Sequence, residues 1–178
     1  MKKQILTPVL TILASAALLL GLSFALKGVA AERAQSEHVR LMQTVLPDST
    51  SFVVEPYTGQ DSGIVSVHKG ETGFVIQTRT PGYAADIEML IGVSMEGKVT
   101  GLVITDMAET AGLGLEALND HEFLAQMLNT SGQLEVGTQV DAITGATVTS
   151  KAVVRSVNSA VAYVTGADVE SGATSWGG

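Results

Sequence analysis

The sequence predicts an α+β fold, in which a mixed, mainly antiparallel sheet carries packed helices behind an N-terminal membrane anchor. Three observations indicate this fold: an uncharged apolar run near the N-terminus, β-rich segments joined by tight turns, and a helical apolar repeat near the C-terminus. The 178 residues suffice for one domain with a real core and a small addition, but not for two full domains.

The anchor is predicted at residues 5–26, which carry no charge. At 1.5 Å per residue this run spans about 33 Å, enough to cross a hydrocarbon core of about 30 Å. The alternative is a cleaved signal peptide, for which residues 29–31 supply small side chains, but signal apolar regions are usually about 7–15 residues long. Lys2 and Lys3 favour a cytoplasmic N-terminus. We therefore expect a single-pass protein of the cytoplasmic (inner) membrane with an extracytoplasmic C-terminal domain.

The net charge differs between the N-terminal segment and the rest of the chain. Residues 1–31 carry three lysines and no acid, whereas residues 32–178 carry a net charge of −11 within a total of −8. The acidic body argues against a nucleic-acid partner. The chain has no cysteine, which excludes disulfides, Cys-ligated metals and a Cys nucleophile, and its three histidines are scattered. We expect no metal site and no catalytic residue.

The body is predicted from a few local patterns. Residues 28–47 form a stalk helix that Pro47 ends, and residues 48–166 form the domain. Strands are expected at 52–54, 64–67, 74–76, 87–94 and 99–105, and their close turns favour antiparallel pairing. Helices are expected at 116–128 and at 150–164, the second ended by Gly166. Residues 167–178 are read as a flexible tail, and residues 1–27 as the anchor.

A glycine pattern at residues 112–117 is similar to a dinucleotide-binding fingerprint, with Glu135 at a suitable distance. That fingerprint needs a strand directly before its first glycine, whereas the polar residues 106–111 intervene here. The segment is also expected outside the cytoplasm. We therefore do not predict a dinucleotide site.

The segment 141–150 is different, because its small and hydroxyl residues end where the last helix begins. One interpretation is a capped helix, since Thr147, Thr149 and Ser150 are all possible N-cap residues. The other is a phosphate site, because Gly145 allows close backbone approach and a helix N-terminus favours an anion. Lys151 adds a positive charge nearby.

The same segment resembles the flavinylation motif of the FMN-binding domain family, D-x-x-[ST]-G-A-[ST]-x-[ST]. The matching residues are Asp141, Thr144, Gly145, Ala146, Thr147 and Thr149. The resemblance implies FMN bound covalently, through a phosphoester that a flavin transferase makes to Thr147. A similar motif at residues 168–174 has no helix behind it, so we expect Thr147 rather than Thr174 to carry the flavin.

Two further blocks extend the resemblance. Residues 109–114 are similar to the E-T-P-G-L-G loop that lies beside the isoalloxazine in this family, with Ala111 in place of proline. The cofactor-binding residues that this implies are Glu109, Thr110, Gly112, Leu113 and Gly114. Upstream, Gly82-Tyr83 begins a stretch similar to the family's G-Y-G-G, with Ala84-Ala85 in place of the two glycines.

The layout of anchor, stalk and domain resembles the G subunits of Rnf electron transport complexes, a family related to the C subunits of sodium-pumping NADH:quinone reductases. The resemblance implies an electron-transfer subunit of a membrane ion-translocating ferredoxin:NAD oxidoreductase, with other membrane subunits as partners. Such a chain is a relay and not a complete enzyme. Two alternatives stay open: a stand-alone membrane-anchored extracytoplasmic flavoprotein, and a non-redox anchored binding or scaffold module.

Overall fold

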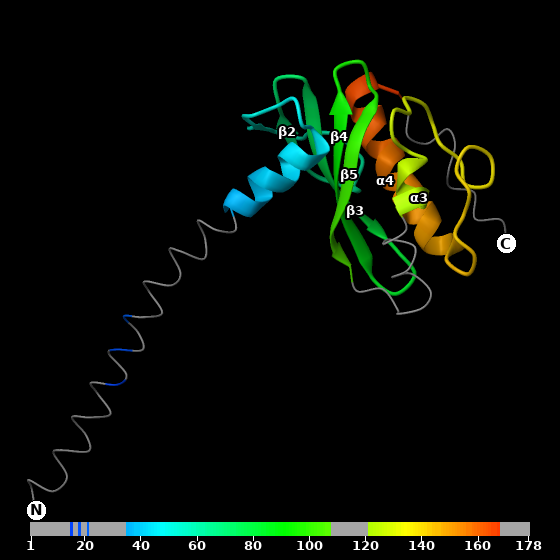
Figure 1. The fold of residues 1–178 in the computed structure, drawn as a ribbon, viewed down its shortest axis with the longest axis horizontal. Helices are drawn as coiled ribbons and strands as arrows, with labels where there is room; N and C mark the ends of the chain where they lie inside the picture. Colours follow the sequence, from blue (N-terminus) through cyan, green and yellow to red (C-terminus); the bar gives the residue numbers. More distant parts are fainter. Residues whose placement is uncertain (1–14, 16–17, 19–20, 22–34, 108–120, 168–178) are drawn as a thin grey trace, which may run out of the picture. The chain divides into compact units, whose positions relative to one another are not determined.

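The computed structural model describes Ser15, Leu18, Gly21 and residues 35–107 and 121–167 (Figure 1). The chain forms two units, residues 1–40 and 41–178. In the first, the described residues are helical, and Arg40 makes an ion pair with Glu37. No helix among the described residues is long and apolar enough to cross a membrane. Most of the predicted anchor, residues 5–26, lies outside the described ranges.

The second unit is built on a five-stranded sheet in the order β1-β2-β3-β4-β5. The strands are β1 (Val53–Glu55), β2 (Ile64–Lys69), β3 (Gly73–Pro81), β4 (Asp86–Ser94) and β5 (Val99–Met107). They confirm the five predicted strands. Each neighbouring pair is antiparallel, so within the described residues the prediction of a mixed sheet is wrong. Short connections explain this, because a parallel pair needs a long crossover.

The helix α4 (Thr147–Thr165) packs across β3 and β4 on one face of the sheet (Figure 1). Its end was predicted correctly: Gly166 adopts φ +69° and its N–H donates to the carbonyl oxygen of Ala162 at 2.8 Å. Between the helix and the sheet lies the main core, to which α4 contributes its valines and β4 its alternate apolar residues. The fully buried side chains of β4 on this face are Ile87, Met89, Ile91 and Val93.

The opposite face of the sheet is covered near one end by the last turn of the helix over residues 35–45. Gly92 and Gly101 are paired across β4 and β5, and a Cβ atom on Gly92 would lie 2.1 Å from the carbonyl oxygen of Val45. The hydroxyl of Thr100 donates to that same oxygen at 2.6 Å. The two glycines therefore let the backbone of Val45 lie directly on the sheet.

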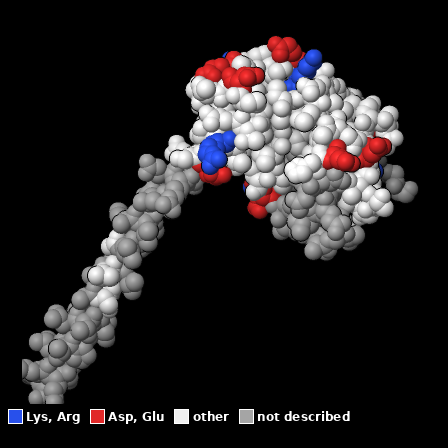
Figure 2. All heavy atoms as spheres, in the orientation of Figure 1, with Lys and Arg blue, Asp and Glu red and all other residues white. Residues whose placement is uncertain are grey.

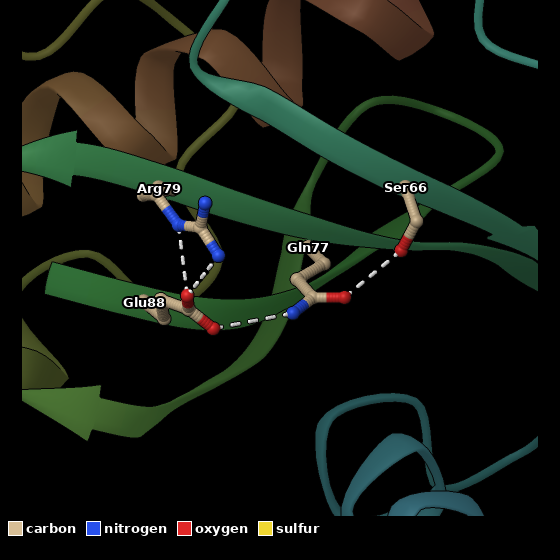
Figure 3. A network of polar contacts seen from close by, with 4 residues as sticks. All are labelled: Ser66, Gln77, Arg79 and Glu88. Carbon is tan, nitrogen blue, oxygen red and sulfur yellow. Dashed lines mark hydrogen bonds and ion pairs between the residues drawn. The ribbon is translucent and has the colours of Figure 1, made fainter. Parts of the chain in front are cut away.

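Further along this face the side chains are polar (Figure 3). Ser66 donates to the amide oxygen of Gln77 at 3.0 Å, and the Gln77 amide nitrogen donates to Glu88 at 3.4 Å. The Arg79 Nε atom donates to the other oxygen of Glu88 at 2.8 Å. The network links β2, β3 and β4. On the face drawn in Figure 2, acidic side chains lie in several separate groups, as expected for an acidic body.

The helix predicted at 116–128 is shorter within the described residues, where α3 covers His121–Ala125. Turns follow as far as Asn129, which adopts φ +60°. The reason is tertiary: the Asn129 N–H donates to the carbonyl oxygen of Val99, and the Val99 N–H donates to that of Thr130. Before these bonds the chain tightens into turns, in which the N–H groups of residues 126–128 donate to carbonyl oxygens three residues back. Leu128 is 39% exposed.

Candidate functional site

One end of the sheet gathers the segments that carry the sequence motifs. Pro81, the last residue of β3, pairs with Asp86, the first of β4, and Ile87 pairs with Met107, the last of β5. The loop 82–85 and the end of β5 therefore lie side by side. The block that follows Met107 contains Glu109, Thr110, Gly112, Leu113 and Gly114, and it lies outside the described residues.

A pocket of about 250 Å³ lies at this end, between the loop 82–85 and the start of α4. Tyr83 lines it together with Gly145, Ala146, Thr147, Val148 and Thr149. The tyrosine is 64% exposed. Two blocks that are 60 residues apart in the sequence thus form one pocket. Sequence reasoning did not place Tyr83 among the site residues, although the likeness of Gly82-Tyr83 to a family motif was the available signal.

The segment that leads into α4 is held in a defined shape. Gly145 adopts φ +82°, a conformation that a residue with a Cβ atom rarely takes. The Ala146 N–H donates to the carbonyl oxygen of Ile143 at 2.9 Å, and the Ile143 N–H donates to the Ser150 hydroxyl at 3.2 Å. Upstream, the Asp141 N–H donates to the side chain of Gln126 at 2.8 Å. Asp141 and Thr144 are exposed but lie outside the pocket lining.

The three hydroxyl residues predicted as possible caps have unlike surroundings. The N-cap residue is Ala146, and no side chain caps the helix there, so the cap prediction is wrong. Ser150 is fully buried, and its hydroxyl donates to the carbonyl oxygen of Ala146 at 2.9 Å. Thr149 is 1% exposed, whereas Thr147 is exposed and lies on the pocket. α4 starts three residues earlier than predicted, which moves Thr149 and Ser150 into its first turn.

The start of α4 offers hydrogen-bond donors to an anion. The first N–H of the helix to find an acceptor within it is that of Ser150, which donates to Ala146. The N–H groups of residues 147–149 precede it and have no acceptor inside the helix. With the positive end of the helix dipole they suit a phosphate. The exposed Thr147 hydroxyl, the donors and the pocket beside Tyr83 therefore fit a phosphorylated aromatic cofactor.

The described residues contain no group of three or more His, Asp or Glu side chains that could hold a metal ion. A second pocket, of about 220 Å³, is lined by Thr80, Pro81, Asp86 and Arg155, with Ser62, Gly63 and Arg79. Thr80 also makes a buried hydrogen bond, 2.8 Å long, between its hydroxyl and that of Ser156.

The sequence is similar to a known domain family and to known proteins. Residues 82–162 match the family model described as FMN-binding domain, a range that includes every residue lining the first pocket. The chain is 32% identical over 178 residues to the G subunit of the ion-translocating oxidoreductase complex of Methanosarcina acetivorans. That match covers 90% of this chain and 93% of the relative.

Two further relatives match over shorter stretches. The G subunit of the Na(+)-translocating ferredoxin:NAD(+) oxidoreductase complex of Acetobacterium woodii is 33% identical, over 61% of this chain and 54% of its own. The G subunit of the proton-translocating ferredoxin:NAD(+) oxidoreductase complex of Clostridium ljungdahlii is 36% identical, over 52% of this chain and 53% of its own. The chain spans about half the length of these two relatives.

Proposed function

The chain belongs to the family of G subunits of ion-translocating oxidoreductase complexes, and we propose that it is an electron-transfer subunit of such a complex, a ferredoxin:NAD oxidoreductase. We further propose that it relays electrons through FMN bound covalently to Thr147. The other subunits of the complex are its partners, and a flavin transferase is its maturation partner. The protein is membrane-associated. We propose that a single N-terminal helix anchors it in the membrane and that the domain lies on the extracytoplasmic side.

The observation that carries the proposal is that the Thr147 side chain is exposed and lines the same pocket as Tyr83. Of the three hydroxyl residues from 147 to 150, it is the one with an exposed side chain. A transferase must reach the oxygen that it modifies, and Thr149 and Ser150 are buried. In the proposed step, the Thr147 oxygen attacks the flavin-side phosphorus of an activated donor, a flavin dinucleotide held by the transferase. The pyrophosphate P–O bond breaks, the nucleoside monophosphate leaves, and the hydroxyl proton passes to a base of the transferase. The product is a phosphodiester with one negative charge.

The chain's own residues supply position and electrostatics, while FMN supplies the one- and two-electron redox chemistry. The N–H groups at the start of α4 bind the phosphodiester oxygens. The positive φ of Gly145 turns the chain so that Thr147 begins the helix beside Tyr83. The Tyr83 ring offers a flat apolar surface to the flavin. Because the chain has no cysteine, an iron–sulfur cluster held by its thiolates is excluded as the electron carrier.

The test is flavin fluorescence of the denatured chain in a gel, after production together with a flavin transferase. We expect a fluorescent band for the natural chain and none for Thr147→Ala. Thr144→Ala is the matched control, because Thr144 is also exposed and in the motif but lies outside the pocket lining. It should keep at least part of the label. A peptide with the FMN mass increment that excludes Thr147 would contradict the proposed attachment.

The same preparation separates the open alternatives. Co-purification of integral membrane subunits with the flavin-bearing chain supports the complex. A fluorescent chain that purifies from membranes without them would support the stand-alone flavoprotein. A chain that stays unlabelled in the presence of an active transferase would contradict both flavin proposals and favour the scaffold module.

A further inference from the structure

α4 exposes a narrow stripe behind Thr147. From residue 147 to residue 162 its exposed side chains are Thr147, Lys151 and Arg155, which are spaced four residues apart. Residues at this spacing lie on one face of a helix, about 6 Å apart along its axis. Side chains on a helix lean towards its N-terminus, so both cations lean towards Thr147. We call these three residues the α4 stripe.

The two cations of the stripe are not paired with described carboxylates. Ion pairs between described residues join Arg79 to Glu88 and Arg40 to Glu37, and neither includes Lys151 or Arg155. The body around them carries a net charge of −11, so acidic partners are plentiful in the sequence. Asp86 is the carboxylate that faces Arg155, because both line the second pocket, yet they make no ion pair there.

We infer that Lys151 and Arg155 form a cationic site for a flavin attached at Thr147, an inference that rests on the proposed function. Lys151, one turn behind Thr147, binds the phosphodiester. A negative group followed by a positive one four residues later is the favourable order on a helix. Arg155, one turn further and lining the second pocket with Pro81 and Asp86, favours the negative charge that reduction adds. The stripe thereby raises the reduction potential of the flavin in an otherwise acidic body.

The experiment compares the midpoint potentials of the flavin-bearing chain and its charge variants at about 0.1 M salt. Lys151→Gln and Arg155→Gln should each lower the equilibrium constant for flavin reduction by about fivefold. This is the effect of one unit charge at close range in water. A tenfold loss corresponds to about 59 mV for one electron. Asp86→Asn should shift the potential in the opposite direction, because it removes the opposing charge. These shifts should shrink at about 1 M salt, which screens exposed charges.

Lys98→Gln is the matched control, because it removes the same charge at the other end of β4. The nine residues of β4 span about 27 Å, well beyond the screening length of about 10 Å at 0.1 M salt. We expect Lys98→Gln to leave the midpoint potential of the flavin unchanged. Lys151→Arg and Arg155→Lys keep the charge and should restore the potential, which separates electrostatics from a structural effect.

The outcomes separate the two proposals. A natural chain that carries no covalent flavin overturns the proposed function and this inference together. A flavin-bearing chain whose potential is the same in the Lys151 and Arg155 variants overturns the inference alone. Equal shifts in the Lys98 variant and the stripe variants would also overturn it, because they would show a dependence on net charge and not on position.

Discussion

The two ends of the sheet differ in how their backbone groups are used. At the hairpin end, the turns 70–73 and 94–98 are closed by bonds from Gly70 to Gly73 and from Ser94 to Lys98, of 2.9 and 2.8 Å. At the site end, the loop 82–85 is also closed, by a bond of 2.9 Å from Gly82 to Ala85. The start of α4, which lines the pocket there, adds N–H groups that have no acceptor within the helix. The two ends therefore differ at the start of α4, whose first N–H groups have no acceptor within the helix at the site end.

Packing follows the same division. At the hairpin end, a Cβ atom on Gly97 would lie 2.4 Å from the Thr165 side chain, and Ser49 bonds the Thr72 hydroxyl at 3.0 Å. At the site end, Tyr83 and Thr147 are exposed. We therefore expect changes to buried contacts, at either end, to alter stability, and changes to the exposed residues of the site end to alter flavin attachment.

The largest stability effect is expected for Gly92→Ala, because the new Cβ would meet the carbonyl oxygen of Val45 at 2.1 Å. Backbone must move to accept it, at a cost of about 3 kcal/mol or more. Urea unfolding measures the loss. Gly132→Ala is the control, since nothing lies within 4 Å of that Cβ and its free energy of unfolding should change by less than about 1 kcal/mol. Equal effects of both would contradict the proposed contact.

A smaller loss is expected for Asn158→Ala, which tests whether the loop before the site depends on α4. The buried Asn158 amide accepts from the Leu134 N–H at 2.9 Å and donates to the Leu134 carbonyl oxygen at 2.8 Å. Removing it leaves two backbone groups unpaired and costs about 2–3 kcal/mol. Thermal unfolding with the flavin yield of the folded fraction measures both consequences. A loss below about 0.5 kcal/mol would show that water replaces the amide.

The buried bond between Thr80 and Ser156 should contribute less. It joins β3 to α4. Thr80→Val and Ser156→Ala should each cost about 1–2 kcal/mol, because each leaves the other hydroxyl unpaired. The double variant should cost less than their sum, with a coupling of about 1 kcal/mol in a double-mutant cycle. Strictly additive losses would mean that the two hydroxyls do not interact in solution.

The smallest expected effect is a pH dependence of the free energy of unfolding, which comes from Glu71 at the hairpin end. Hydrogen bonds from the Thr50 backbone, and then from the Ser51 hydroxyl, lower the pKa of Glu71. A lowered pKa means that the contribution to stability is present at neutral pH and is lost as the pH falls through that pKa, below the ordinary value of about 4.3. An NMR titration of the Glu71 carboxyl should show the low value. Ser51→Ala should raise it, and an unchanged midpoint would contradict the role of that hydroxyl.

Much of the fold could be predicted from local sequence. Turn residues and β-rich runs located all five strands, and Gly166 located the end of α4. The helix start was missed because Thr147, Thr149 and Ser150 are equally good caps by type. Burial distinguishes them, and burial depends on how α4 lies on β3 and β4. The end of α3 was missed for a similar reason, since Val99 is distant in sequence.

By itself, the sequence determined the chemistry that this protein can and cannot use. It has no thiol, its body is acidic, and one loop combines threonines with Gly145 before a helix. Only the tertiary structure decided which hydroxyl is accessible and what faces it. The antiparallel pairing brings the loop 82–85 to the start of α4, so that Tyr83 and Thr147 share a pocket. Composition and spacing act along the chain, whereas exposure and proximity arise only when distant segments pack.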